Sequence, residues 1–385
     1  MTAKGCLLSP GSTTQTFSNN EYTVAGLFSG CGGLDIGFKK AGFKVVWANE
    51  WDADAAISYE SLMGHSPIVE DIWNVLDEIP DVDIIIGGPP CQSFSLIGKR
   101  LEEDSRGKLV HAFSEAIRRK MPKAFVMENV PGLVSSSIDG VRLPAHLITG
   151  FEKLGYQAKL YKVMATDYFV PQRRNRILII GVLKGYPPDY LVNGSEFAKI
   201  IQLSDQDLPV TARDALDDLP IAGPKNSTKL IKYTKNPRSG YAKLMRINAD
   251  EFVSLQNMPT MSVLDQEFVK HIPPGGNYMD VPDEFSTKRI MNFKKTGGRT
   301  TTYGRLDPNK PSYTINTYFN RPNVGANYHY KYARLITVRE ALRLQSFPDE
   351  FTPFYKSQRS LHMQIGNAVP PLLARAIAES LKTVI

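Results

Sequence analysis

The chain has 385 residues, of which 42% are hydrophobic and 22% are charged, and its net charge is +7. This composition supports a large folded core and excludes an intrinsically disordered chain, while the length is typical of two or three domains or one large α/β domain with an insertion. The cysteines Cys6, Cys31 and Cys91 form no CxxC pair, which argues against a disulfide framework and a zinc site. No apolar run reaches the roughly 18 residues of a membrane helix, and the N-terminus lacks a signal-peptide pattern, so we expect a cytoplasmic protein.

Apolar strands alternate with helices in the first half of the chain. Strands are predicted at 23–28, 45–49, 82–87, 124–128 and 177–182, and helices at 34–38, 52–63 and 106–119. Strands that are apolar on both faces and alternate with helices predict an α/β fold with a mostly parallel sheet, covered by helices on both sides. In such sheets, ligands bind outside the carboxyl ends of the strands.

The regular pattern stops near Leu183 and returns at Arg334, where helices are predicted at 337–345 and 368–381. The intervening residues are rich in Pro, Gly, Asn and Tyr and show few clear periods. We therefore expect a polar tail at 1–20, a discontinuous large domain at 21–184 plus 334–385, and a smaller irregular domain at 185–333.

A glycine-rich turn, residues 28–33, follows the first strand and opens a helix. Glycines let a ligand approach the backbone and a helix N-terminus favours negative charge, although an ordinary tight turn has the same pattern. Glu50 ends the second strand about twenty residues later, where an acidic side chain can hold ribose hydroxyls. Trp51 can stack on an adenine, although such a tryptophan is more often part of the core. Asp71 and Ile72 follow a short third strand at the same edge.

Three further groups lie near strand ends. Cys91 stands in the loop 87–95, whose prolines, glycines and polar residues are typical of an exposed nucleophile rather than a buried structural cysteine. Glu128 ends the following strand. Arg174 and Arg176 precede the last apolar strand and point to one face if extended, so they can together hold a carboxylate, a phosphate or a carbonyl oxygen.

Taken together and in this order, these motifs resemble the cytosine-C5 DNA methyltransferase family. The matching stretches are 28–33, Glu50-Trp51, Asp71-Ile72, 88–95, 104–107, 128–130, 172–176, 334–341, 344–348 and 364–371. The resemblance covers nearly all of the chain except the tail and about 185–333. It implies a Rossmann-like, S-adenosylmethionine-dependent catalytic domain that needs no metal, with 185–333 as a target-recognition domain. The implied activity is that of a DNA (cytosine-5-)-methyltransferase of the bacterial or phage modification type.

The resemblance also implies roles for single residues. Cys91 adds to C6 of a flipped cytosine, and Glu128, if protonated, donates to N3 of that base. Arg174 holds O2, and Arg176 orients the glutamate or the loop. The residues implied for S-adenosylmethionine are Phe28, Gly30, Cys31 (through its backbone), Gly33, Glu50, Trp51, Asp71, Ile72, Pro90, Leu109, Asn367 and Ala368.

Positive charge is concentrated in residues 286–333, which contain nine basic residues and one acidic residue. This segment therefore carries +8, and the rest of the chain sums to −1. Basic loops with interleaved aromatic residues suit phosphate contacts and base readout, with a solvated basic surface as the alternative. We expect a monomer bound to double-stranded DNA and no membrane contact. The residues expected at DNA are Ser95, Ile97 (as an apolar wedge), Lys99, Arg100, Lys294, Lys295, Arg299, Arg305, Thr314, Ile315 and Arg321.

Three alternatives stay open at this point. A tRNA cytosine-C5 methyltransferase would share the catalytic motifs, although the large basic insertion favours DNA. A catalytically inactive DNA-binding relative would lose the nucleophile or the donor pocket, whereas Cys91, Glu128 and Glu50 are all present. A nicotinamide-dependent oxidoreductase is weaker, because the glycine spacing differs from GxGxxG.

Overall fold

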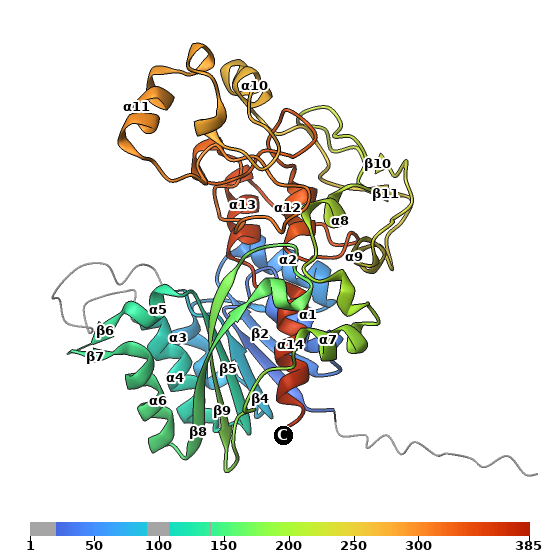
Figure 1. The fold of residues 1–385 in the computed structure, drawn as a ribbon. Coiled ribbons are helices and arrows are strands. Elements are labelled where there is room, and N and C mark those ends of the chain that lie inside the picture. The colour runs from blue at the N-terminus through green and yellow to red at the C-terminus, as the bar shows by residue number, and fades with distance from the viewer. Residues whose placement is uncertain (1–20, 91–107, 139) are drawn as a thin grey trace, which may run out of the picture.

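A seven-stranded sheet organises most of the chain in the computed structural model, which describes residues 21–90, 108–138 and 140–385 (Figure 1). Its strands are β1 (Thr23–Leu27), β2 (Lys44–Glu50), β3 (Ile68–Val69), β4 (Ile84–Gly87), β5 (Ala124–Asn129), β8 (Tyr156–Met164) and β9 (Asn175–Leu183). The spatial order is β3-β2-β1-β4-β5-β9-β8. Strands β1 to β5 are parallel, whereas β9 pairs antiparallel with both β5 and β8.

Helices cover both faces of this sheet, because successive strand residues point to opposite sides. Ile84 and Ile86 of β4 belong to the hydrophobic cluster on one face, and Ile85 belongs to the cluster on the other. The helices packed on the first face are α1 (Gly33–Lys40), α7 (Gly194–Ile201) and α14 (Pro371–Leu381), and those on the second are α3 (Ile72–Val75), α4 (Lys108–Lys120) and α6 (Leu143–Lys153). Helix α2 (Ala53–Met63) packs beside α1 and β2. The predicted α/β fold is confirmed.

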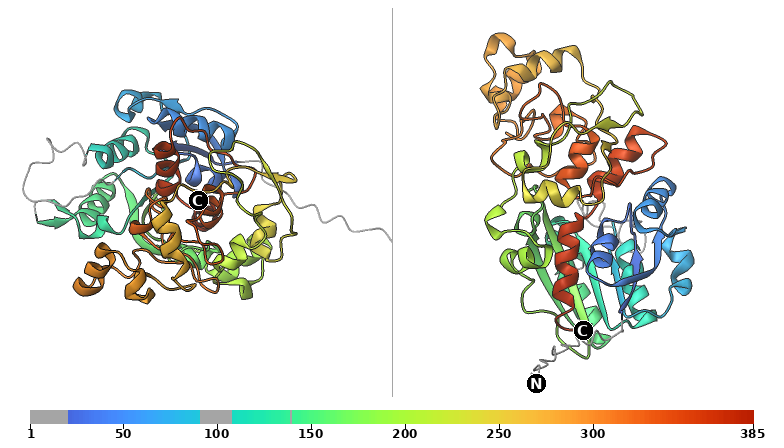
Figure 2. Two further views of the ribbon diagram at one scale, coloured as in Figure 1. Left: turned by 90° about the horizontal axis from the view of Figure 1, so that it is seen from above. Right: turned by 90° about the vertical axis from the view of Figure 1, so that its right-hand side faces the viewer.

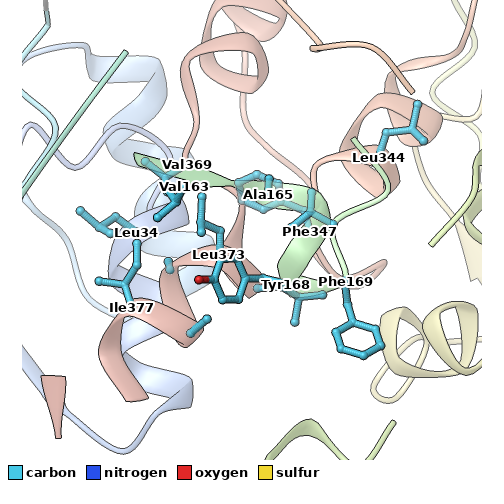
Figure 3. Packing of buried hydrophobic residues seen from close by; sticks show 14 of the residues in the cluster. Leu34, Val163, Ala165, Tyr168, Phe169, Leu344, Phe347, Val369, Leu373 and Ile377 are labelled. Atoms are coloured by element: carbon cyan, nitrogen blue, oxygen red, sulfur yellow. The ribbon is translucent and has the colours of Figure 1, made fainter. Parts of the chain in front are cut away.

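Helices α1 and α14 approach closely although they lie at opposite ends of the sequence. A Cβ atom at Gly37 would lie 2.3 Å from Cβ of Ala374, so only glycine permits this distance between the two helices. Figure 3 shows Leu34 of α1 packed near Leu373 and Ile377 of α14. The C-terminal helix therefore packs beside the first helix on one face of the sheet.

Most of the remaining elements form an irregular part that lies above the sheet in Figure 1 and in the right-hand view of Figure 2. They are α8 (Ala212–Leu216), β10 (Ile231–Lys232), α9 (Gly240–Met245), β11 (Phe252–Val253), α10 (Val263–Lys270) and α11 (Lys288–Thr296). Helices α12 (Val338–Leu344) and α13 (Gln358–Asn367) adjoin this part, but their buried apolar side chains join the hydrophobic cluster of the sheet. Short elements α5 (Gly132–Ser135), β6 (Ser137–Ile138) and β7 (Val141–Arg142) lie beside α6. A separate hydrophobic cluster spans 268–335, whereas buried side chains of 191–253 join the cluster of the sheet. The second core therefore begins later than the boundary at 185 that the sequence suggests.

Helix α12 is attached to this irregular part by a buried arginine. Arg343 is fully buried, and its guanidinium donates to Asp349 at 2.5 Å and to Asp218 at 3.0 Å. A third contact reaches the carbonyl of Ala215 at 2.8 Å. Because both carboxylates are buried, they depend on this guanidinium for compensation of their charge.

Replacement of Arg343 by leucine is expected to lower the free energy of unfolding by about 3–5 kcal/mol, because it leaves two buried carboxylates without their main partner. Urea titration of the full chain measures this loss. The control is Arg238→Leu at an exposed position, where we expect a change below about 0.5 kcal/mol. Equal unfolding midpoints for the two variants would contradict the assigned role of Arg343.

Candidate active site

The antiparallel direction of β9 brings two distant motifs together. Glu128 pairs with Leu178 and Asn129 with Ile177, so the residues just before Ile177 lie beyond the carboxyl end of β5. A parallel β9 would have carried those residues to the opposite edge of the sheet. Arg176 therefore lies beside Glu128, and Nε of Arg176 is 2.5 Å from Oε1 of Glu128.

Glu128 also faces the loop that follows β4. A Cβ atom at Gly88 would lie 3.0 Å from Oε2 of Glu128, so the carboxylate lies directly over the start of the Pro89-Pro90-Cys91 segment. The side-chain amide of Asn129 donates to the carbonyl of Pro89 at 3.0 Å and fixes the same loop. Cys91 itself, with Ser95, Ile97, Lys99 and Arg100, lies outside the described residues.

Arg174 makes a different set of contacts from Arg176. Its side chain is 1% exposed, and its Nη atoms donate to the carbonyls of Ile315, Gly366 and Ala368 at 2.8–2.9 Å. These contacts tie the start of β9 to two distant segments of the chain. They favour a structural role for Arg174 in place of the contact with O2 that the resemblance implies, whereas Arg176 lies next to Glu128, where it can orient the carboxylate.

The glycine-rich turn and Glu50 are joined by a hydrogen bond. The Gly30 amide donates to Oε2 of Glu50 at 2.7 Å, and the Asp52 amide donates to Oε1 at 2.9 Å. A Cβ atom at Gly30 would meet no atom within 4 Å, so the turn presents open backbone there. Burial raises the pKa of Glu50. Phe28, the first residue of this turn, has a left-handed φ of 55°.

The structure assigns other residues of this turn to packing. Cys31 is 2% exposed, and burial raises the pKa of its thiol to about 12, so this thiol is neutral at pH 7. A Cβ atom at Gly33 would lie 2.2 Å from the carbonyl oxygen of Val369. Gly33 thus lets the C-terminal segment pack against the turn, which brings the exposed Asn367 and half-buried Ala368 to the same region.

Trp51 is 76% exposed, so its ring is free to stack and is not part of the core. Asp71 is exposed and caps α3 by accepting from the Trp73 amide at 3.0 Å, whereas Ile72 is buried. Pro90 is exposed and Leu109 is partly buried. The order of strands reverses between β1 and β4, and ligands of doubly wound sheets bind at such a point.

Asp35, which sequence reasoning missed, lies directly under the turn. Its side chain is 1% exposed, and its Oδ1 accepts from Ser29 Oγ at 3.1 Å and from the Tyr59 hydroxyl at 3.3 Å. A Cβ atom at Gly26 would lie 2.0 Å from Oδ1 of Asp35. Asp35 is the only charged residue in the stretch Leu34 to Phe38, and this contrast is the sequence signal that could have identified it.

Asp35 is expected to make stability depend on pH, because burial raises its pKa to about 7. The folded chain then holds the proton more tightly than the unfolded chain, so the stabilisation is complete below about pH 4 and is lost as pH rises through about 7. The free energy of unfolding of the wild type should fall by up to about 4 kcal/mol relative to Asp35→Asn across this window. Urea titrations of both proteins from pH 4 to 8 measure it, and parallel pH profiles would contradict the assignment.

The basic residues expected at DNA divide into two groups. Lys295, Arg299 and Arg321 are exposed. Lys294 instead pairs with Asp283 at 2.7 Å, and Arg305 donates to the carbonyls of Ile272 and His329 at 2.7 and 3.0 Å. The charged groups of these two side chains therefore already have partners within the irregular part.

Thr314 and Ile315 lie next to the arginine motif. The Thr314 hydroxyl donates to the carbonyl of Arg173 at 2.6 Å, and the Ile315 amide donates to the Gln172 side chain at 2.9 Å. Ile315 is 1% exposed, so its side chain packs internally. The segment that follows Thr314 is thus anchored beside the predicted catalytic edge.

Comparison with known proteins decides the family. A model of the family described as C-5 cytosine-specific DNA methylase matches residues 22–383. The chain belongs to this family. It is a DNA cytosine-5 methyltransferase with an S-adenosylmethionine-dependent methyltransferase fold, as the sequence motifs predict.

The similar curated proteins are type II methyltransferases. M.AgeI of Thalassovita gelatinovora is 30% identical over 93% of this chain and 99% of its own length. M.NgoFVII of Neisseria gonorrhoeae is 33% identical over 94% of this chain and 87% of its own length.

Solved structures give the same fold. A protein assigned as a DNA modification methyltransferase of an E. coli prophage is 28% identical with a TM-score of 0.69, covering 94% of this methyltransferase and 99% of the prophage protein. S. pombe Dnmt2 methyltransferase has a TM-score of 0.58 at 16% identity, over 94% of this chain and 99% of its own, and shows the fold alone.

Within 21–90, 108–138 and 140–385, no helix is long and apolar enough to cross a membrane. The same ranges contain no group of three or more His, Cys, Asp or Glu side chains suited to a metal ion.

Proposed function

We propose that this methyltransferase modifies C5 of a cytosine flipped out of duplex DNA, through a covalent bond between Cys91 and C6 of the base. The observation that carries the proposal is the placement of the Glu128–Arg176 pair beside the loop that leads to Cys91. A thiolate, a carboxyl group and a guanidinium at one strand edge are the groups that this reaction requires.

The residues around the glycine-rich turn fit S-adenosylmethionine. Gly30 presents open backbone at a helix N-terminus, Glu50 lies within hydrogen-bond distance of it, and Trp51 offers an exposed ring. The adenine would stack on Trp51, the ribose would bind Glu50 and the methionine end would lie along the turn. The remaining residues of this proposed site are Phe28, Cys31 (backbone), Gly33, Asp71, Ile72, Pro90, Leu109, Asn367 and Ala368. When bound, the cofactor supplies an electrophilic methyl group.

The chain's own groups make the cytosine reactive. The Cys91 thiolate adds to C6, and the ring electrons move toward N3 and O2 so that C5 becomes nucleophilic. Glu128, when protonated, donates to N3, and Arg176 stabilises negative charge at O2 while it orients the glutamate. Arg174 positions this edge through its three carbonyl contacts. After methylation a base removes the C5 proton, and Cys91 leaves as the C5–C6 double bond re-forms.

The base must leave the duplex before these groups reach it. The loop after Cys91 supplies Ser95, Ile97, Lys99 and Arg100, of which Ile97 would fill the vacated space as an apolar wedge. The exposed Lys295, Arg299 and Arg321 of the small domain would bind DNA phosphates. We propose that the enzyme acts as a monomer on DNA and that 185–333 selects the target sequence.

The names of the relatives support a role in restriction–modification. M.AgeI and M.NgoFVII are named as type II methyltransferases, and both cover over 90% of this chain. We therefore propose that the enzyme protects DNA from a partner endonuclease.

Bisulfite sequencing of plasmid DNA from expressing and non-expressing E. coli tests the proposed function. We expect protected cytosines at one position of one short sequence motif, and their absence would contradict methylation of DNA. Incubation of the purified enzyme with labelled S-adenosylmethionine and either duplex DNA or tRNA separates the two nucleic acids. Label in tRNA but not in DNA would overturn the DNA substrate.

A further inference from the structure

A cavity of about 300 Å³ lies between the segment 317–321 and helix α13. It is lined by Thr317, Tyr318, Asn320, Arg321, Arg359 and His362. A Cβ atom at Gly366 would lie 2.3 Å from the Thr317 amide nitrogen, so the two elements are in direct backbone contact. The cavity is therefore a fixed part of the seam between the small domain and the catalytic domain.

The walls of this cavity carry positive charge only. Arg321 and Arg359 are both exposed, and no carboxylate lines the cavity among the described residues. Over the same residues neither guanidinium forms an ion pair, in contrast to Lys294 with Asp283. The Arg321 guanidinium lies 4.6 Å from the ring centre of Tyr318, which holds it at the cavity wall.

His362 contributes shape rather than charge. Its ring is 6% exposed and packs edge-on against Phe319 at 4.7 Å. Burial lowers the pKa of His362 to about 4, so the ring is neutral at pH 7. The charge of the cavity at neutral pH therefore comes from the two arginines, with Thr317 and Asn320 as neutral donors.

We propose that this cavity binds a phosphodiester group of the DNA substrate, held between Arg321 of the small domain and Arg359 of α13. This inference rests on the proposed function, because it takes duplex DNA as the substrate. Two guanidinium groups form forked, charge-assisted hydrogen bonds with phosphate oxygens, and hydroxyl and amide groups commonly add to such contacts. The catalytic domain thereby contacts the DNA backbone directly, at a position that the basic segment 286–333 does not include.

The position of Arg359 gives this contact a further role. Helix α13 ends at Asn367, and Gly366 beside it is held by Arg174 and packed on Thr317. A phosphate bound across the seam would therefore fix the small domain relative to the edge of the sheet that carries Glu128. Arg359 is a positioning residue in this arrangement.

Fluorescence anisotropy with a labelled duplex of arbitrary sequence tests the proposal for Arg321→Gln and Arg359→Gln across a range of salt. Each variant should bind about 3- to 10-fold more weakly, with a slope of log K against log salt reduced by about 0.9 for one lost phosphate contact. The control is Lys44→Gln, an equal loss of charge at an exposed position at the start of β2, which should keep the wild-type slope. Calorimetric titration with S-adenosylmethionine and the melting temperature should be unchanged in all three variants.

Two outcomes overturn the inference: slopes like that of Lys44→Gln in both variants, or a reduced slope in Arg321→Gln alone. The second outcome would leave a contact of the small domain only and remove Arg359 from the DNA surface. The result is separate from that of the proposed function. If the wild type leaves DNA unmethylated but the salt dependence of DNA binding changes in Arg359→Gln, the proposed function is wrong and the phosphate site stands. If the wild type methylates DNA and Arg359→Gln has the wild-type salt dependence, the phosphate site is wrong and the proposed function stands.

Discussion

Cys91→Ser is expected to abolish methyl transfer and the covalent complex with DNA that contains 5-fluorocytosine. Fluorine at C5 cannot leave as a proton does, so the wild-type enzyme should stay bonded to C6 of the base. Serine is scarcely ionised at neutral pH and is a much weaker nucleophile than a thiolate. Loss of a covalent nucleophile lowers turnover by about 10³- to 10⁶-fold.

The measurement is the mobility shift of the protein under denaturing conditions after incubation with S-adenosylmethionine and the modified DNA. Cys6→Ser, which carries the same chemical change in the N-terminal tail, is the matched control and should retain the complex. A shifted band with Cys91→Ser would contradict the role of Cys91. Absence of the band with the wild type, on DNA that it methylates when unmodified, would contradict the covalent mechanism.

Glu128→Gln is expected to lower kcat by about 10²- to 10⁴-fold. Glutamine has nearly the size and shape of glutamate, but its amide cannot deliver a proton to N3 of the cytosine. The change also removes the carboxylate that lies 2.5 Å from the Arg176 guanidinium. Single-turnover methylation measures the chemical step, and anisotropy with duplex DNA measures binding, which should stay within a few-fold of wild type.

The control for Glu128→Gln is Glu152→Gln at an exposed position of α6. It makes the same chemical change far from the sheet edge that carries Glu128, so its kcat should match the wild type. If the kcat of Glu128→Gln equals that of Glu152→Gln, Glu128 takes no part in the chemical step. A low kcat together with a lowered melting temperature would indicate instead that the buried Arg176 has lost its partner.

Local sequence pattern was sufficient for the elements of the sheet domain. The strands predicted at 23–28, 82–87 and 124–128 overlap β1, β4 and β5, and the prediction for β4 starts two residues too early. Such strands are recognisable because a strand buried on both faces is apolar at nearly every position. Helix α6 and strand β8 were missed. The β8 strand is an edge strand with exposed and buried residues mixed, so its sequence carries no continuous apolar run.

The direction of β9 could not be predicted, because an apolar run has the same pattern in parallel and antiparallel pairing. This direction decides the site, since it carries Arg176 to the carboxyl end of β5. The Gln-x-Arg-x-Arg pattern likewise could not predict that Arg174 and Arg176 make different contacts. They depend on carbonyls of Ile315, Gly366 and Ala368, which are more than 140 residues away.

The sequence by itself determined the family, the α/β class, and the residue types present for the chemistry, because these follow from local periodicity and from motifs within short stretches. The tertiary structure alone decided which of those residues meet. Gly33 packs on Val369, Arg176 pairs with Glu128, and Arg321 shares a cavity with Arg359 because chain segments far apart in sequence are brought into contact by burial. The net charge of +7 illustrates the same division. Its location in 286–333 is a property of the sequence, whereas the internal partners of Lys294 and Arg305 and the exposure of Arg321 depend on packing.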